Sequence, residues 1–341
     1  MTELPPPTMT PPTMTVITGD EVTGVVDADR PACVDLVRRA YIAHGRGDSV
    51  NPHSAFLRFP HRPNSRIISL PAYLGGEFDV AGIKWIASFP DNTASGLARA
   101  SAVLVLNDTT TGFPYVCMES SIVSASRTAA SAVLGAEQLV GSRVAQRIGF
   151  IGTGLIAGHV WRFFRDLEWK VGQIRLFDTD PAAAARFATA LAAEGAPDTA
   201  VAPDAAQVFA VCDVVVLATI AGEPHLHDSA LLAGRPVVLH LSLRDLGPEV
   251  VLAAQNITDD VDHAVRERTS LHLAEQQVGH RRFVDGTIAN VLEGRVHRDP
   301  ERAAVYAPFG LGVLDLAVGQ WVHSRTAGSA RPVPGFFPDQ S

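Results

Sequence analysis

The feature that most constrains the fold of this chain is a glycine turn near its middle. A short apolar run, residues 148–151, leads directly into Gly152-Thr-Gly154-Leu-Ile-Ala157, and a helical pattern follows. Strand, glycine turn and helix in this order are typical of a dinucleotide-binding unit. Gly152 permits the tight turn, Gly154 lets the backbone approach a pyrophosphate, and Ala157 lets helix and strand pack closely. Backbone N–H groups at the start of the helix would hold the phosphates. The residues expected to contact the cofactor here are Gly152, Thr153, Gly154, Leu155 and Ile156.

A carboxylate at the end of the next strand predicts which dinucleotide binds. Residues 173–177 are expected to form that strand, and it ends at Asp178, 26 residues beyond Gly152. A carboxylate in this place accepts hydrogen bonds from the ribose hydroxyls of NAD and repels the 2′-phosphate of NADP. Asp180 is better placed than Asp178 to cap the helix that begins at Pro181. We therefore predict NAD rather than NADP.

The region around the glycine turn alternates strands and helices. Uninterrupted apolar runs at residues 214–218 and 236–241 indicate a parallel sheet covered on both faces. The other elements expected here are a helix over 181–194, a strand over 199–202, a helix from Asp204 and a strand over 256–258. This pattern predicts a central Rossmann-type domain over residues 127–305.

The rest of the chain follows a different pattern, and 341 residues are enough for two domains. Two helices, at 21–27 and 31–45, precede short strands at 56–59, 66–70, 80–88 and 101–106. A helix over 120–141 links the two regions, and a final helix from Tyr306 is too short to be a domain. The predicted class is therefore α/β, with a second, α+β domain that is split between residues 16–126 and 306–341. The Thr- and Pro-rich residues 1–15 are expected to be a disordered tail.

Composition narrows the range of partners. A net charge of -8 without a basic stripe argues against nucleic acid. Three widely spaced cysteines fit neither a disulfide framework nor a zinc site, which predicts a reducing, cytoplasmic compartment. The first residues lack the features of a signal peptide. The apolar window at 208–220 is interrupted by Asp213 and is too short to cross a bilayer, so no membrane partner is expected. The histidines have no metal-ligand spacing relative to a carboxylate or cysteine, so no bound metal is expected either.

Candidate site residues follow the predicted parallel strands, because ligands of open α/β sheets bind beyond the carboxyl ends of the strands. Thr219 and Ser242 each follow such a strand and are expected near the nicotinamide end of the cofactor. Asp245 is the candidate acid–base group of this half of the chain. Its local sequence fits a turn or helix-cap aspartate equally well.

Two basic residues outside the Rossmann region are also candidates. Lys84 lies in a strand-like segment between large apolar residues. This pattern favours a solvent-facing lysine on an edge strand over one that pairs a substrate carboxylate in a cleft. Arg127 has small neighbours on the linking helix, which suit either an anion site or an interdomain salt bridge.

Four segments resemble the ornithine cyclodeaminase/mu-crystallin family: residues 82–92, 126–130, 149–154 and 311–317. The resemblance implies a substrate domain split around a central Rossmann domain, and a homodimer formed by the substrate domains. It also implies that Lys84 and Arg127 bind substrate carboxylates, that Lys84 and Asp245 are catalytic, and that Thr128 contacts the cofactor.

Within the family, residues 51–59, 66–76, 83–92, 113–121 and 308–315 resemble a branch that oxidises N-(2-amino-2-carboxyethyl)-L-glutamate. The sequence around Asp245, and Pro308 in place of a serine, depart from the cyclodeaminases and argue against ornithine cyclisation.

The resemblance to this branch implies that NAD-dependent oxidation of a small amino-acid-derived substrate releases 2-oxoglutarate and 2,3-diaminopropionate, a precursor of siderophores or other secondary metabolites. Lys84, Arg127 and Arg58 would hold the substrate carboxylates, and Asp245 would act as a general base on water. The alternatives are an ornithine cyclodeaminase, a ketimine reductase and a mu-crystallin-like protein that binds a nicotinamide cofactor.

Overall fold

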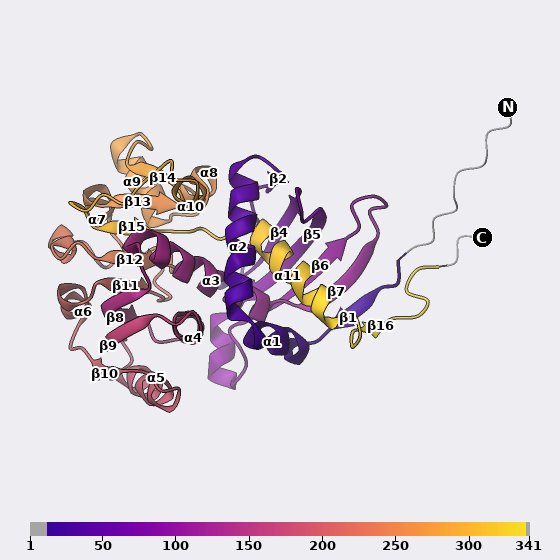
Figure 1. Ribbon diagram of the computed structural model, residues 1–341, viewed down its shortest axis with the longest axis horizontal. Coiled ribbons are helices and arrows are strands. Elements are labelled where there is room, and N and C mark those ends of the chain that lie inside the picture. Colours follow the sequence, from indigo (N-terminus) through magenta and orange to yellow (C-terminus); the bar gives the residue numbers. More distant parts are fainter. Residues whose placement is uncertain (1–11, 339–341) are drawn as a thin grey trace.

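The computed structural model describes residues 12–338, which form two eight-stranded sheets. Helix α2 (Arg30–Gly45) and helix α3 (Ser121–Val140) lie between the sheets, as Figure 1 shows. The chain passes from one sheet to the other along α3 and returns through the segment that follows Tyr306. The predicted α/β class with a Rossmann-type parallel sheet is confirmed.

The Rossmann sheet has the order β10-β9-β8-β11-β12-β15-β13-β14, and every neighbouring pair is parallel. All residues of β11, β12, β13 and β15 are buried, as expected for parallel strands covered on both faces. Its strands are β8 (Val144–Ile151), β9 (Lys170–Phe177), β10 (Asp198–Val201), β11 (Val214–Leu217), β12 (Val237–His240), β13 (Gln255–Thr258), β14 (Val284–Thr287) and β15 (Ala304–Tyr306).

The start of the predicted final helix needs a correction. The helix expected from Tyr306 begins instead at Gly312, because residues 304–306 form β15. This strand pairs with both β12 and β13 and therefore lies inside the sheet. The sequence did not predict β14 or β15, because Val284-Asp-Gly-Thr287 has no apolar run and the three residues of β15 are too few to show one.

The two helices that the sequence predicted from Pro181 and from Asp204 are present in the structure. Asp180 caps α5 by accepting a hydrogen bond from the N–H of Ala182, and Asp204 caps α6 through the N–H of Gln207. The helical elements are α4 (Leu155–Asp166), α5 (Pro181–Ala193), α6 (Ala205–Val211), η2 (Ser229–Leu232), α7 (Pro248–Ala253), α8 (Val261–Ala264), α9 (Ser270–Val278) and α10 (Ile288–Leu292).

The second sheet has the order β16-β1-β7-β6-β5-β4-β2, with β3 paired to β4. Strand β5 lies between β4 and β6, so the edge-strand position predicted for Lys84 is wrong. Thr15, the last residue of the expected tail, belongs to β1, and residues 1–11 lie outside the described part of the chain. The strands are β1 (Thr15–Ile17), β2 (Ser49–Val50), β3 (Ala55–Phe59), β4 (Arg62–Leu74), β5 (Val80–Ser88), β6 (Ala100–Asn107), β7 (Pro114–Glu119) and β16 (Arg331–Pro332).

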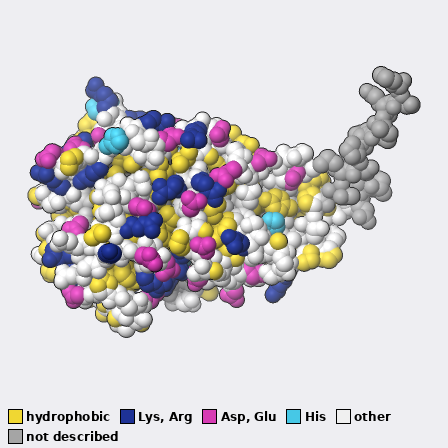
Figure 2. Space-filling model, in the orientation of Figure 1, with side chains coloured by type: hydrophobic (Ala, Val, Ile, Leu, Met, Phe, Trp, Pro, Cys, Tyr) yellow, Lys and Arg dark blue, Asp and Glu magenta, His cyan; other side chains and the backbone are white. Residues whose placement is uncertain are grey.

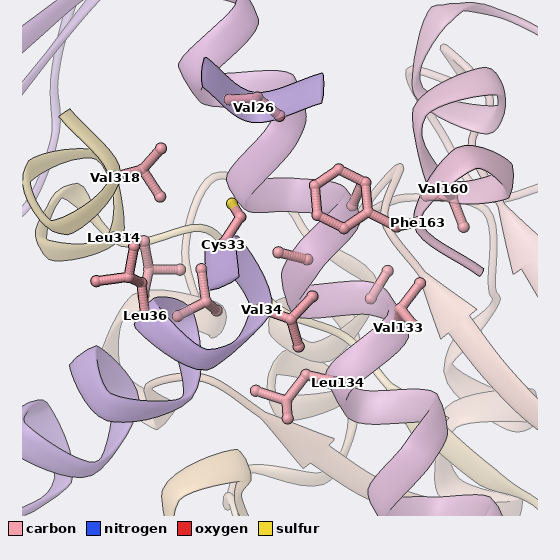
Figure 3. Packing of buried hydrophobic residues seen from close by; sticks show 14 of the residues in the cluster. Val26, Cys33, Val34, Leu36, Val133, Leu134, Val160, Phe163, Leu314 and Val318 are labelled. Carbon is pink, nitrogen blue, oxygen red and sulfur yellow. The ribbon is translucent and has the colours of Figure 1, made fainter. Parts of the chain in front are cut away.

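Three further helical elements, α1 (Gly19–Ala28), η1 (Pro90–Ser95) and α11 (Gly312–Thr326), complete the fold. Helix α11 packs against β4, β5 and β6 on one face of the second sheet. Figure 3 shows how α2, α3, α4 and α11 share one core: Val34, Val133, Phe163 and Leu314 come from these four helices in turn and belong to a single buried cluster. The two sheets are therefore joined by a continuous hydrophobic interior.

The described surface is mixed in charge. On the face that Figure 2 shows, basic and acidic side chains are interspersed over the Rossmann half. Among residues 12–338, no helix combines the length and the apolar character that crossing a membrane requires.

Candidate active site

The glycine turn after β8 has the backbone geometry that its sequence predicted. Gly152 has a φ of +84°, and a Cβ placed on it would lie 2.6 Å from the carbonyl oxygen of Ala218. Only glycine fits this position. Gly154 is the N-cap of α4 and supplies no side-chain hydrogen bond, which leaves the first N–H groups of that helix free to hold phosphate oxygens.

Asp178 stands beside this turn, at the carboxyl end of β9. Its Oδ2 accepts hydrogen bonds of 2.8 Å from both the N–H and the hydroxyl of Thr153, and its Oδ1 accepts one of 3.0 Å from the N–H of Asp180. Partial burial raises the pKa of Asp178, but these hydrogen bonds outweigh it and hold the pKa below its usual value. The carboxylate is therefore ionised and next to the expected path of the dinucleotide.

A cleft between the two sheets consists of two adjoining cavities. The smaller, of about 260 Å³, reaches the cofactor side and is lined by Thr128, Ile156, Thr219 and Ser242. The larger, of about 670 Å³, reaches over β3, β4 and β5 of the second sheet. Both cavities are lined by Arg66, Arg127, Leu243, Arg244 and Phe309. The predicted cofactor residues and the predicted substrate residues therefore lie in one continuous cleft.

Lys84 and Arg127 line the larger cavity, and both pair with the same buried carboxylate, that of Asp315. Lys84 Nζ lies 2.7 Å from Asp315 Oδ2, and Arg127 Nε lies 3.2 Å from Asp315 Oδ1. Lys84 is 1% exposed, so the expectation of a solvent-facing lysine is wrong. Burial lowers the pKa of Lys84 to about 8, against the attraction of Asp315. Two cations on one carboxylate leave a net positive charge for an anionic ligand.

Asp315 is a site residue to which sequence analysis gave no role. It lies on α11 and is fully buried. A signal was present, because Asp315 stands inside the apolar run Val313-Leu-Asp-Leu-Ala317. A carboxylate in such a run has to be paired when it is buried. Its partners come from β5 and α3, and only the folded chain identifies them.

Three more arginines in the cleft were also missed. Arg66, Arg99 and Arg244 line the smaller cavity, and within residues 12–338 no carboxylate lies at ion-pair distance from any of them. Burial lowers the pKa of Arg66, and the neighbouring charges of Arg244, Arg99 and Arg58 lower it further. Arg58, the third predicted carboxylate ligand, is exposed at the outer rim and pairs with Glu267 at 2.8 Å.

The carboxylate of Asp245 does not line the cleft, contrary to the expectation that it acts on substrate directly. It is fully buried behind Thr219 and Ser242, accepts a hydrogen bond from each of their hydroxyls, and lies 3.1 Å from His240 Nε2. Burial raises the pKa of Asp245, but His240 and the two hydroxyls lower it to about 2. Asp245 therefore reaches the cleft through the hydroxyls that it orients.

The segment between β15 and α11 closes the cleft on one side. Asp259 holds this segment by accepting hydrogen bonds from the N–H groups of Phe309 (2.9 Å) and Gly310 (2.7 Å). Gly310 has a φ of +96°, and a Cβ on it would lie 2.5 Å from Nη1 of Arg127. The segment is thus fitted against the guanidinium of Arg127.

With this geometry established, comparison with known proteins identifies the family. The model of the ornithine cyclodeaminase/mu-crystallin family matches residues 16–330, and the chain belongs to this family. One relative is N-((2S)-2-amino-2-carboxyethyl)-L-glutamate dehydrogenase of Staphylococcus aureus, which is 26% identical over 301 residues, covering 86% of this chain and 89% of the relative.

Two solved structures share the fold. The Δ(1)-pyrroline-2-carboxylate reductase of Thermococcus litoralis, in complex with NADH and L-proline, has a TM-score of 0.84 at 20% identity, covering 94% of this chain and 100% of the other. An archaeal alanine dehydrogenase dimer with bound NAD has a TM-score of 0.82 at 24% identity, covering 95% and 99% of the two chains.

Proposed function

We propose that this protein is an NAD-dependent dehydrogenase that oxidises a CH–NH bond of N-(2-amino-2-carboxyethyl)-L-glutamate. The products are 2-oxoglutarate and 2,3-diaminopropionate, which would supply siderophore or other secondary-metabolite biosynthesis. Family membership and the similarity to the S. aureus dehydrogenase support the reaction class.

The observation that carries the substrate assignment is the excess of positive charge in the cleft. Lys84, Arg66, Arg99, Arg127 and Arg244 line it, and among residues 12–338 the only acidic side chain in its lining is Glu267. The proposed substrate has three carboxylates, which guanidinium groups bind well. Ornithine has one carboxylate and two amines, so this cleft would repel its side-chain ammonium.

The residues around the glycine turn fit the cofactor. The N–H groups of residues 152–156 would hold the pyrophosphate, and Asp178 would accept hydrogen bonds from the ribose. Thr128, Thr219 and Ser242 would lie beside the nicotinamide at the smaller cavity. Bound NAD supplies the acceptor for the hydride that leaves the glutamate α-carbon.

The chain's own groups orient the substrate and its water. Lys84 and Arg127 would fix carboxylates of the glutamate half so that its α-carbon faces the smaller cavity, and such orientation supplies a large share of the barrier reduction. Loss of the hydride and the N–H proton gives an imine, and water adds to it to release the amine. Thr219, held by Asp245, would orient this water, and the negative charge of Asp245 would stabilise the cationic form of the imine.

The outer face of the second sheet supports the homodimer that the family resemblance implied. Leu57, Trp85 and Val103 are 47%, 43% and 42% exposed there, and Trp85 pairs with Val103 across β5 and β6. Since α11 covers the opposite face, residues 12–338 of a single chain leave these apolar side chains uncovered. We infer that a second copy covers them.

The direct test is product analysis by mass spectrometry. Purified protein is incubated with NAD and synthetic N-(2-amino-2-carboxyethyl)-L-glutamate, and in parallel with NAD and ornithine. We expect 2-oxoglutarate and 2,3-diaminopropionate from the first mixture and no proline from the second. Proline from ornithine, with no turnover of the first substrate, would replace the proposal by a cyclodeaminase.

A further inference from the structure

The mouth of the larger cavity carries an acidic group in otherwise basic surroundings. Glu267 Oε2 lies 2.8 Å from Nη2 of Arg58. Glu267 comes from the turn between α8 and α9 of the Rossmann half, whereas Arg58 comes from β3 of the second sheet. The pair therefore faces across the cleft, and both side chains line it.

The turn that carries Glu267 is held in an unusual backbone conformation. Glu267 and Arg268 have φ values of +52° and +56°, two successive left-handed residues without a glycine. The guanidinium of Arg244 fixes this turn by donating two hydrogen bonds, of 2.6 Å and 3.2 Å, to the carbonyl oxygen of Glu267. Left-handed non-glycine residues that neighbouring groups hold in place are concentrated at ligand-binding sites.

We propose that Glu267 and Arg58 form the subsite for the amino-acid end of the leaving amine. Glu267 would bind its ammonium group and Arg58 its carboxylate. This inference rests on the proposed function and names the residue that selects the amine half of the substrate. Glu267 is thereby a specificity residue, which favours N-substituents that carry an amino group.

The arrangement of charges supports this assignment. An arginine beside a glutamate is complementary to the carboxylate and ammonium of an α-amino acid. Glu267 lines only the larger cavity, whereas Thr219 and Ser242 line only the smaller one. A substrate whose reacting carbon lies at the cofactor side would thus extend its leaving half toward Glu267. Since the other charged groups lining the described cleft are cationic, Glu267 is the group there that can pair an ammonium.

The test compares two substrates that differ by one amino group. N-(2-amino-2-carboxyethyl)-L-glutamate and N-(2-carboxyethyl)-L-glutamate both yield 2-oxoglutarate and NADH, so one assay measures kcat/KM for each. We expect the wild-type protein to prefer the amino substrate by roughly tenfold or more, the usual effect of a charge-assisted contact. Glu267→Gln should lose most of this preference, mainly through a higher KM for the amino substrate.

Two further variants make the comparison specific. Arg58→Gln should lower kcat/KM for both substrates by a similar factor, because both carry the carboxylate, and should leave their ratio nearly unchanged. Glu275→Gln is the matched control: it removes a carboxylate from α9 that pairs with Arg281 and does not line the cleft. The ratio of its kcat/KM values for the two substrates should equal that of the wild type. Melting temperature and NAD affinity are measured for each variant to verify that it is folded.

The outcomes separate the two proposals. Turnover of the amino substrate with the same ratio in wild type and Glu267→Gln would overturn the subsite and leave the proposed function standing. Absence of turnover of both substrates by the folded, NAD-binding wild-type protein would overturn the proposed function and the subsite with it.

Discussion

At the scale of single residues, the described part of the cleft contains two kinds of charged group: carboxylates that are paired with neighbouring groups, and arginines that are not. Asp315 is fully buried between Lys84 and Arg127, and Asp245 is fully buried among hydrogen-bond donors. Arg66 and Arg99, in contrast, line the cleft without a carboxylate at ion-pair distance within residues 12–338. An anionic ligand gains the most binding free energy at these arginines, because its negative charge attracts both of them and offsets the repulsion between them.

The first prediction concerns the choice of cofactor. Asp178→Ala should narrow the preference for NAD over NADP by roughly tenfold, because it removes both the ribose hydrogen bonds and the repulsion of the 2′-phosphate. Titration calorimetry with each cofactor measures the change. Equal or tighter binding of NADP by the unaltered protein would contradict the assignment of Asp178.

The second prediction concerns the pH dependence of substrate capture. Burial lowers the pKa of Lys84 to about 8, so the free protein loses this positive charge as the pH rises through that value. We expect kcat/KM to fall above pH 8, and Lys84→Met to lower it at all pH values. Because the folded chain holds this proton less tightly than the unfolded chain, the free energy of unfolding should rise between pH 8 and the ordinary lysine value of 10.5.

The control for this prediction is the cofactor. NAD affinity, measured by calorimetry over the same pH range, should not change at pH 8 in either protein. A kcat/KM profile for Lys84→Met that keeps the wild-type magnitude and shape would remove Lys84 from the substrate site.

The third prediction concerns Asp245. Asp245→Asn keeps the size of the side chain but removes its negative charge, so turnover should fall about a hundredfold while NAD still binds. Because the pKa of Asp245 is lowered to about 2, its charge is present at neutral pH. The contribution of this charge to the free energy of unfolding is lost only as the pH falls from about 4 toward 2. A stable and fully active Asp245→Asn enzyme would show that the charge of Asp245 is not needed for turnover, and that Asp245 is a turn residue only.

At the scale of elements, α3 determines how the two halves meet. It carries Arg127 and Thr128 into the cleft and contacts α2, α4, β12 and β15 along its length. Ser131 bonds at 2.8 Å to the hydroxyls of both Tyr41 on α2 and Tyr306 on β15. A helix packed on both sheets keeps the predicted cofactor residues and the predicted substrate residues in a fixed relation.

The fourth prediction tests this close packing. Gly135→Ala should destabilise the protein by about 1–3 kcal/mol, because its Cβ would lie 2.3 Å from the ring of Tyr306. Gly24→Ala, in α1, is the matched control: no atom of the described residues lies within 4 Å of the added Cβ, so the better helix former should stabilise by roughly 0.5–1 kcal/mol. Urea unfolding distinguishes the two, and equal effects would show that α3 is not tightly packed.

At the scale of the whole molecule, the two faces of the second sheet differ: one faces α11 and the cleft, and the other is exposed. Lys84 points toward α11 and the cleft, whereas Trp85, the next residue along β5, is exposed on the other face. The alternation of side chains along a single strand thus places the proposed substrate ligand on one face and the proposed dimer contact on the other.

The fifth prediction follows from this division. Trp85→Glu should dissociate the proposed dimer, because it places a charge among apolar residues that a second copy would cover. Sedimentation velocity measures the mass in solution. Val144→Glu, at a 51% exposed position on β8 of the Rossmann sheet, is the control and should leave the mass unchanged. A monomeric wild-type protein would exclude the dimer.

The sequence by itself determined the features that depend on local pattern. The glycine turn, the position of Asp178, the cap Asp180, the helix from Asp204, and the buried strands β11, β12 and β13 were predictable, because turn geometry, helix capping and hydrophobic periodicity involve residues that are close in the chain. The family resemblance added the prediction that Lys84 and Arg127 are substrate ligands.

Only the tertiary structure decided how charges pair and where they face. Lys84 was expected at an edge because its neighbours in sequence cannot show that β4 and β6 flank its strand. Asp315 meets Lys84 across 231 positions of sequence (315 − 84), and Arg66, Arg99 and Arg244 converge from separate segments. Such contacts depend on long-range packing, which sets the distance between charges and the burial of each. Long-range packing produces no periodic pattern of residues, so these contacts could not be predicted from the sequence.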